Sequence, residues 1–186
     1  MSVEMSKLKK AIKKHKNMMV VNTADSSGEL FQMVGYNGNL YRVDNMPILN
    51  DVQMLTFLGM EKADKGSLNY KESNVLGNMF QDDCPGEEQL FFNILMSDPE
   101  LVAFWPSGIS GGEVVFSMAE SFLLAGMTGN TRAFLRKDNN LTCIAIKEGM
   151  FLKALLVPQD VTVETLLDTL DNERMILECA LKQEKE

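Results

Sequence analysis

Residues 29–44 read ELFQMVGYNGNLYRVD and predict a β-hairpin. Two strand-forming runs flank Asn37-Gly38, a dipeptide that tolerates the positive φ angles required at both central positions of a type I′ turn. A second group of strand patterns lies late in the chain, at residues 131–136, 141–147 and 150–157. We therefore expect two antiparallel meanders, one in each half of the chain.

Helical patterns flank these strands. Met5, Leu8 and Ile12 form an apolar stripe on an N-terminal helix, and helical spacing recurs from Pro47 to Gly59. Five further segments have clear patterns. Three are strands, at 18–22, 89–96 and 100–105. Two are helices: a central helix at 114–125 and a long amphipathic C-terminal helix beginning near Thr162, with apolar positions at Val163, Leu167, Leu170, Leu177 and Leu181.

This order of elements predicts an α+β fold in which an antiparallel sheet carries N-terminal, central and long C-terminal helices, because hairpins join the strands and no βαβ crossover recurs. The 186 residues, 45% of them hydrophobic, suit a single domain, residues 1–186. Residues 60–88 are polar and glycine-containing, and we expect an insertion or mobile loop there. Residues 3–60 and 113–183 share the order α-β-β-β-α, which suggests an internal duplication.

Charge is distributed unevenly along the chain. Residues 1–16 carry six of the 18 basic residues and one of the 26 acidic residues, whereas residues 17–186 have a net charge of −13. Because phosphate contacts need a basic surface, we expect no nucleic-acid binding by the acidic body. The N-terminal helix is interpreted first as a docked helix with a solvated lysine face. The alternative interpretations of this helix are that it binds a partner or an anionic membrane surface.

No stretch has the roughly 18–20 uninterrupted apolar residues of a membrane span, and the lysine-rich N-terminus lacks the apolar region of a signal peptide. We therefore expect no stable membrane insertion. Cys84, Cys143 and Cys179 are odd in number and have no metal-like spacing, which favours a reducing compartment. The expected location is cytoplasmic.

A single histidine, His15, excludes most histidine chemistry. It lies among Lys13, Lys14 and Lys16, far from any nucleophile-elbow motif, so a Ser-His-Asp or Cys-His relay is not expected. Zinc sites draw on several histidines or paired cysteines, and this chain has one histidine and no closely spaced cysteines. No catalytic residue, metal ligand or cofactor is predicted, and among enzymes only carboxylate-dependent ones remain as an alternative.

Two loops offer ligand-binding alternatives. Gly108, Gly111 and Gly112 lie between a strand and a helix pattern, where backbone N–H groups could hold a phosphate. The loop lacks the lysine of a P-loop, and a plain turn is the preferred interpretation. Asp82-Asp83 and Glu87-Glu88 form an acidic loop that fits no EF-hand spacing and is interpreted as a solvated turn, with divalent-ion binding as the minority view. These loops are the basis of a small-molecule or ion-binding sensor hypothesis.

Methionine is abundant, with fourteen residues, and its flexible side chain suits surfaces that accept apolar segments of varied shape. Most methionines fall in strand or helix patterns and are expected in the core. Met18 and Met19 lie near element ends. Together with Leu8 and Ile12 of the first helix, they are our candidate partner-binding residues.

The segments FFNILM, ELVAFWPSG, VVFSMAESFLLAGM, TRAFLRKDNN, LTCIAIKEGM, FLKALLVP and TVETLLDTLDNERMILECALKQ, within residues 89–183, resemble in order and acidity the chaperones of bacterial type III secretion. The resemblance implies the α+β sandwich of that family and a cytoplasmic homodimer without catalytic activity. It implies a chaperone or adaptor that holds a segment of a secreted or effector protein, with a protein client or a secretion-system component as partner. This is the leading functional hypothesis.

Overall fold

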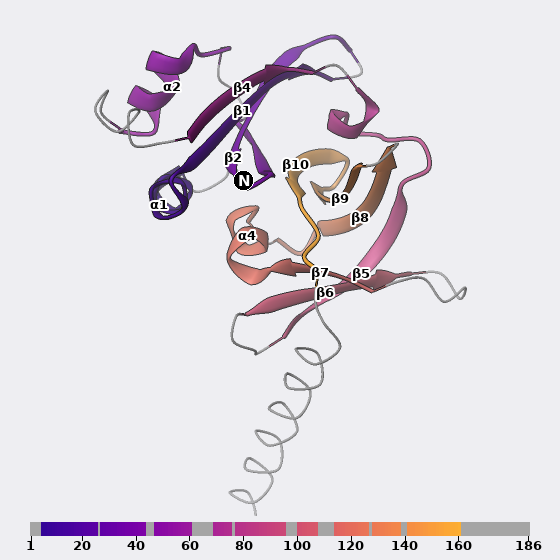
Figure 1. The fold of residues 1–186 in the computed structure, drawn as a ribbon. Coiled ribbons are helices and arrows are strands. Elements are labelled where there is room, and N and C mark those ends of the chain that lie inside the picture. Colours follow the sequence, from indigo (N-terminus) through magenta and orange to yellow (C-terminus); the bar gives the residue numbers. More distant parts are fainter. Residues whose placement is uncertain are drawn as a thin grey trace, which may run out of the picture.

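The structure is a computed structural model, and its described part is dominated by one ten-stranded β-sheet (Figure 1). The described residues are 5–25, 27–43, 47–60, 69–75, 77–95, 100–107, 114–126, 128–138 and 141–160. The helices within them are α1 (Met5–His15), α2 (Asp51–Phe57), α4 (Ala119–Leu124) and the 3-10 helix η1 (Asn78–Phe80). The strands are β1 (Asn17–Ala24), β2 (Leu30–Tyr36), β3 (Asn39–Val43), β4 (Asn69–Asn74), β5 (Glu88–Leu95), β6 (Leu101–Pro106), β7 (Val115–Met118), β8 (Thr131–Asp138), β9 (Leu141–Glu148) and β10 (Phe151–Leu156).

The strand order is β4-β1-β2-β3-β10-β9-β8-β5-β6-β7. Among the described strands, β1 and β4 are a parallel pair, and the other neighbours are antiparallel. In Figure 1 the sheet wraps from β4 and β1 at the top, through β10, β9 and β8, to β5 and β6 at the bottom. Helices α1 and α4 lie inside this wrap, so both face the concave side of the sheet.

The predicted hairpin is confirmed. Asn37 and Gly38 have φ angles of 50° and 84°, and Tyr36 pairs with Asn39 across the turn. The second predicted meander is also confirmed as β8, β9 and β10. Both meanders form because strand-forming residues alternate around short turns that need only local contacts.

The two meanders join through β3 and β10. Tyr41 pairs with Ala154 and Leu40 with Leu155, and the Val157 N–H donates to Asn39 Oδ1 at 3.0 Å. Each meander follows a helix, so α1-β1-β2-β3 and α4-β8-β9-β10 have the same order. The sheet order β1-β2-β3-β10-β9-β8 places the two units symmetrically about the β3–β10 pair, while the last helix expected for the second unit lies outside the described residues.

The predicted fold class, an α+β sandwich built on an antiparallel sheet with N-terminal, central and long C-terminal helices, is wrong. The described residues form one continuous mixed sheet, and the three α-helices have 11, 7 and 6 residues. Residues 114–125 were expected to be wholly helical, yet β7 takes Val115–Met118 and pairs with β6, because its β-branched and aromatic residues suit a strand. The expected helix from Thr162 lies outside the described residues.

Two hydrophobic clusters cover the two faces of the sheet. The inner cluster joins the buried sides of α1, α2 and α4 to the concave face, and the rings of Phe92, Phe104 and Phe122 meet there with centroids 4.9–6.0 Å apart. The outer cluster packs Met79 and Phe80 of η1 against Met33 and Leu152 of the convex face. The buried apolar area on both faces explains why few strands show simple alternation.

The polar segment that the sequence predicts as an insertion or mobile loop, residues 60–88, contributes to both the sheet and the outer cluster where it is described. Residues 69–74 form β4, which pairs with β1 from Asn17↔Asn69 to Asn22↔Asn74. Residues 61–68 and 76 lie outside the described residues. The pairing uses backbone groups, so the polar side chains of β4 gave no strand signal.

Arg136 anchors the end of this segment to the convex face. Its side chain is fully buried and donates to the backbone carbonyls of Met79, Gln81 and Asp82 at 2.6, 2.7 and 3.2 Å. It also pairs with Glu87 at 2.8 Å. A buried guanidinium with this many acceptors is fully hydrogen-bonded, which offsets the cost of removing its charge from water.

No helix among the described residues is long and apolar enough to cross a membrane.

We predict that Arg136→Ala lowers the free energy of unfolding by about 3–5 kcal/mol, because Glu87 and three carbonyls lose a buried partner. Arg132→Ala is the matched control, because Arg132 points to the same face of β8 but is exposed, and it should change stability by less than about 0.5 kcal/mol. Urea unfolding followed by circular dichroism measures both. Equal losses in the two variants would show that Arg136 is not an anchor.

We also predict that Gly35→Ala destabilises the fold by about 3 kcal/mol. A Cβ at Gly35 would collide with the backbone carbonyl of Asn39 on the facing strand, and backbone cannot move aside as a flexible side chain can. Gly77→Ala is the control, because nothing lies within 4 Å of its Cβ position. Thermal melts of the two variants should separate clearly, and coincident melting curves would contradict the packing described here.

Candidate functional site

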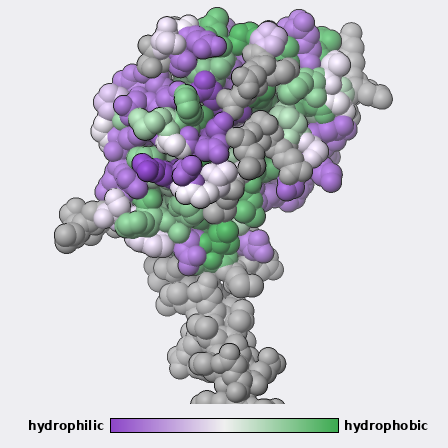
Figure 2. Space-filling view, turned by 180° about the vertical axis from the view of Figure 1, so that it is seen from behind, coloured by the Kyte–Doolittle hydropathy of each residue, from purple (hydrophilic) through white to green (hydrophobic). Residues whose placement is uncertain are grey.

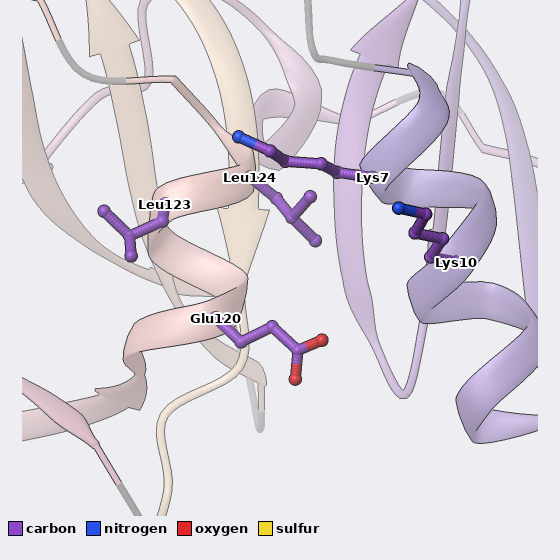
Figure 3. Close-up of a pocket in the computed structure, with 5 residues that line it drawn as sticks. All are labelled: Lys7, Lys10, Glu120, Leu123 and Leu124. Atoms are coloured by element: carbon purple, nitrogen blue, oxygen red, sulfur yellow. The ribbon is translucent and has the colours of Figure 1, made fainter.

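A groove lies between α1 and α4 on the concave side of the molecule (Figure 3). Its volume is about 310 Å³, and five residues line it: Lys7, Lys10, Glu120, Leu123 and Leu124. In Figure 3 Lys7 extends from α1 toward α4, while Glu120 and Leu124 point into the space between the helices. The groove therefore has a basic wall on α1 and a largely apolar wall on α4.

The basic wall follows from the amphipathic pattern of α1. Leu8, Ala11 and Ile12 are buried against the sheet, so the five lysines occupy the remaining sides of the helix. The sequence of α1 contains no acidic residue. Lys7 and Lys10 are three positions apart, which places them on neighbouring turns of one helix face.

The apolar wall follows from the shortness of α4. Phe122 is fully buried in the inner cluster, and each residue turns the helix by about 100°. Leu124 is 5% exposed and forms the deeper part of the wall, whereas Leu123 is 49% exposed and forms its rim. A half-exposed leucine beside a groove offers apolar surface that a partner can cover.

One ion pair links the two helices. Lys14 Nζ donates to Glu120 Oε2 at 2.8 Å, and this hydrogen bond raises the pKa of Lys14. Both side chains are largely exposed, so the pair contributes little to stability. It neutralises the carboxylate of Glu120 on the wall formed by α4.

A buried polar cluster beneath the groove holds the helices in position. The Tyr41 hydroxyl donates to the Ser121 carbonyl at 3.0 Å, and the Tyr36 hydroxyl lies 3.2 Å from Ser121 Oγ. Burial raises the pKa of Tyr41, so its hydroxyl stays protonated and remains a donor. The His15 ring stacks on Tyr36 with centroids 4.7 Å apart. Strands β2 and β3 thereby fix the end of α1 and the middle of α4.

The predicted partner-binding residues do not line this groove. Leu8, Ile12 and Met18 have no exposed surface and belong to the inner cluster. Met19 is half-buried and packs against the outer cluster. The apolar stripe of the first helix thus meets the sheet, as the docked-helix interpretation expects, and the lysine side is the accessible one.

The two loops proposed as ligand sites have different outcomes. Gly108, Gly111 and Gly112 lie outside the described residues. In the acidic loop, Asp82 pairs with Arg42 at 2.9 Å and also accepts from the Leu152 N–H at 2.7 Å. The other paired carboxylate of the loop, that of Glu87, contacts two buried cations.

Glu87 lies between Arg136 and Lys147, whose side chains are 0% and 4% exposed. The Lys147 amino group also lies over the Phe134 ring, 4.5 Å from its centroid. Among the described residues, no group of three histidine, cysteine or carboxylate side chains could hold a metal ion. Asp82 and Glu87 therefore act as internal partners of cations, whereas Asp83 and Glu88 are exposed.

A second apolar surface lies on β5 and β6, away from the groove. Phe91 and Trp105 pair across these strands with ring centroids 6.4 Å apart, and they are 53% and 38% exposed. Figure 2 views the molecule from behind and shows hydrophobic residues gathered at its lower end, where Figure 1 places β5 and β6. The described residues show no occupant for this surface.

Sequence reasoning missed the groove because it needs two helices more than 100 residues apart in the chain. The lysine face of α1 is visible in the sequence, and binding to a partner is one of its interpretations. Leu123 lies within the single longer helix that the sequence predicts over residues 114–125. Because β7 occupies the first part of that segment, α4 begins later and presents Leu123 outward.

The chain matches no protein-family model, and neither the curated proteins nor the solved structures compared with it give a significant match. The resemblance to type III secretion chaperones thus rests on acidity and on an order of elements that the structure corrects at residues 114–125.

We predict that Cys84 and Cys143 resist alkylation in the folded protein. Both are buried free thiols, and burial raises the pKa of Cys143 to about 12 and also raises that of Cys84. The thiolate is the reactive form, so its fraction stays small between about pH 7 and pH 9. Iodoacetamide labelling followed by peptide mass spectrometry should modify these two residues only after denaturation. Rapid native labelling at pH 8 would contradict this.

Proposed function

We propose that this protein is a noncatalytic chaperone or adaptor that holds a segment of a client protein in the groove between α1 and α4. The observation that carries the proposal is the groove itself, an open cleft between two helices in which Leu124 of α4 faces the lysine wall of α1, with Leu123 at the rim. Grooves of this kind receive peptide segments through a few apolar anchor residues.

The size and openness of the groove favour a segment over a small molecule. Small-molecule sites usually have volumes of about 300–1,000 Å³ and enclose most of their ligand. The groove lies at the lower end of this range, and its lining residue Leu123 remains half-exposed. It suits one or two apolar side chains of a longer chain whose remainder lies outside.

The groove is also preorganised. The Tyr36, Tyr41 and Ser121 contacts fix α4, and the buried side of α1 is packed into the inner cluster. A rigid site does not have to become ordered on binding, which spares the complex an entropic cost. These contacts support a function in which α1 and α4 keep their positions while client segments bind and dissociate.

The proposal extends to the finer features implied by the secretion-chaperone resemblance: a secreted or effector protein or a secretion-system component as partner, a homodimer and a cytoplasmic location. The odd number of cysteines and the two buried free thiols support a reducing compartment. The exposed Phe91 and Trp105 offer an apolar surface for subunit association.

The test is peptide selection against the whole protein. A displayed library of random peptides of about 15 residues is selected on the immobilised chain, and the enriched peptides are measured by fluorescence anisotropy. We predict that Leu123→Asp weakens their binding about tenfold or more, because a carboxylate replaces the apolar rim of the groove. Leu141→Asp is the matched control, since Leu141 is 55% exposed and lies on β9.

Retained binding in Leu141→Asp together with loss in Leu123→Asp would support the proposal. Equal binding in both variants would place the peptide site outside the groove. Failure to enrich any peptide would overturn the segment-holding function. Circular dichroism of both variants verifies that the fold is intact, which is expected because each leucine is already half-exposed.

A further inference from the structure

We infer that residues 162–181 of this chain pack as an amphipathic helix on one face of β5, β6 and β7, the face that points away from the inner cluster. This face lies on the opposite side of the sheet from α1 and α4. The packing of the segment therefore does not depend on the proposed function of the groove.

A third hydrophobic cluster lies on this face and is called the edge cluster here. Its five members come from three neighbouring strands and are Leu95, Leu101, Ala103, Phe116 and Met118. The antiparallel register pairs Leu101 with Leu95 on one side and with Met118 on the other, so these side chains share a face. Val102 and Phe104 alternate with them along β6 and belong to the inner cluster.

The edge cluster is buried more deeply than one layer of sheet allows. Leu101, Ala103 and Phe116 are 4%, 8% and 9% exposed. Within the part of the chain that the structure describes, the members of the cluster all belong to β5, β6 and β7. A sheet face loses its contact with water when a second layer packs on it. The covering layer therefore comes from a segment outside the described residues.

The cover ends before the far side of the same face. Phe91 and Trp105 pair with each other there and are 53% and 38% exposed. The side chains nearest to β7 are thus the buried ones, which places the covering segment over the β7 side of the face.

The last described residues lie beside the edge cluster. The Gln159 N–H donates to the Phe116 carbonyl at 2.8 Å, and this bridge places Gln159 next to β7, the last strand of the sheet. Two residues separate Gln159 from Thr162. Because an extended chain advances at most about 3.6 Å per residue, Thr162 lies within about 11 Å of Gln159. The segment that follows therefore starts next to the face that needs a cover.

The sequence of residues 162–181 supplies a matching apolar stripe. Its apolar positions recur at intervals of three, four or seven residues, so they share one side of an α-helix. They are Val163, Leu167, Leu170, Leu177 and Leu181. A helix of this length measures about 30 Å by 10–12 Å, and β5 and β7 lie about 10 Å apart across β6. One helix is thus large enough to cover the edge cluster.

Two other segments outside the described residues adjoin these strands. Residues 96–99 (MSDP) lie between β5 and β6, and residues 108–113 (GISGGE) lie between β6 and β7. Each contains one large apolar residue, Met96 or Ile109. Neither segment has the run of apolar side chains that a covering layer requires, which leaves residues 162–181 as the occupant.

Hydrogen–deuterium exchange of the whole protein, read by peptide mass spectrometry, tests this packing. Most helical stability in proteins comes from tertiary packing, so a helix that packs on nothing exchanges rapidly. We predict that the amides of residues 163–181 exchange at least about tenfold more slowly than those of an unstructured chain. Exchange at the unstructured rate would overturn the inference.

Leu167→Asp with Leu170→Asp should abolish this protection and speed exchange in β6 and β7, because two carboxylates interrupt the apolar stripe. Thr165→Asp with Thr169→Asp is the matched control. It adds the same charge on the side of the helix opposite the stripe, and it should keep the protection. Unchanged exchange in β9 verifies that the sheet stays folded. Equal protection in the two double variants would contradict packing through the stripe.

The face of the sheet is tested by Leu95→Asp, which places a carboxylate in the edge cluster. This variant should lower the protection of residues 163–181 about tenfold. Ile94→Asp is the matched control, because Ile94 is the neighbouring residue, points to the other face of β5 and is 37% exposed. Protection lost in Ile94→Asp and kept in Leu95→Asp would overturn the inference, since the segment would then pack on the inner face.

A second copy of the chain is the other occupant tested. Light scattering gives the oligomeric state at each protein concentration used for exchange. Protection of residues 163–181 that is independent of concentration would support packing within one chain. Protection that disappears on dilution, as a dimer dissociates, would overturn the inference in favour of a second copy.

Discussion

The pairing of β3 with β10 is the interaction on which the rest of the structure depends. It joins Tyr41 to Ala154 and Leu40 to Leu155, residues more than 110 positions apart, and so fuses two local meanders into one sheet. Each meander carries a helix at its start. When β3 meets β10, the concave face closes around α1 and α4 and brings their exposed sides together. The groove exists only because this non-local pairing forms, and the loop-closure entropy it costs is offset by the shared inner core.

On the convex face, two carboxylates of this acidic chain stabilise the fold by pairing with cations of the sheet. Asp82 and Glu87 are paired with Arg42, Arg136 and Lys147, which lie on three different strands of the sheet. The acidic loop therefore serves as a clamp that holds η1 over the outer cluster. Buried ion pairs of this kind contribute modest net stability, but they specify one arrangement, because misplacing any member leaves an unpaired buried charge. This explains why a polar segment can cover a hydrophobic surface.

On the concave side the charged side chains lie at the surface and are not buried. The lysines of α1 remain accessible, and one of the carboxylates nearest to them, that of Glu120, is paired with Lys14. The basic helix α1 thus packs on a protein whose remainder is acidic, next to an apolar wall of α4 that is only partly buried. Separated charge steers a partner during encounter and orients it, while the buried apolar contact keeps it bound. The proposed chaperone or adaptor function would use the partly exposed apolar wall in this way.

The sequence by itself determined the local elements. Alternation and turn chemistry predicted both meanders, including the positive φ angles at Asn37 and Gly38, and the apolar stripe predicted α1 with its lysine side outward. Only the tertiary structure decided the fold class and the site. Strand β4 has no hydrophobic pattern because it joins the sheet through backbone hydrogen bonds. Which side chains of α4 are exposed depends on the residue at which β7 ends and α4 begins. The groove is lined by Lys7 and Leu124, which are more than 100 positions apart in the chain. No local sequence pattern encodes which distant helices a curved sheet brings together.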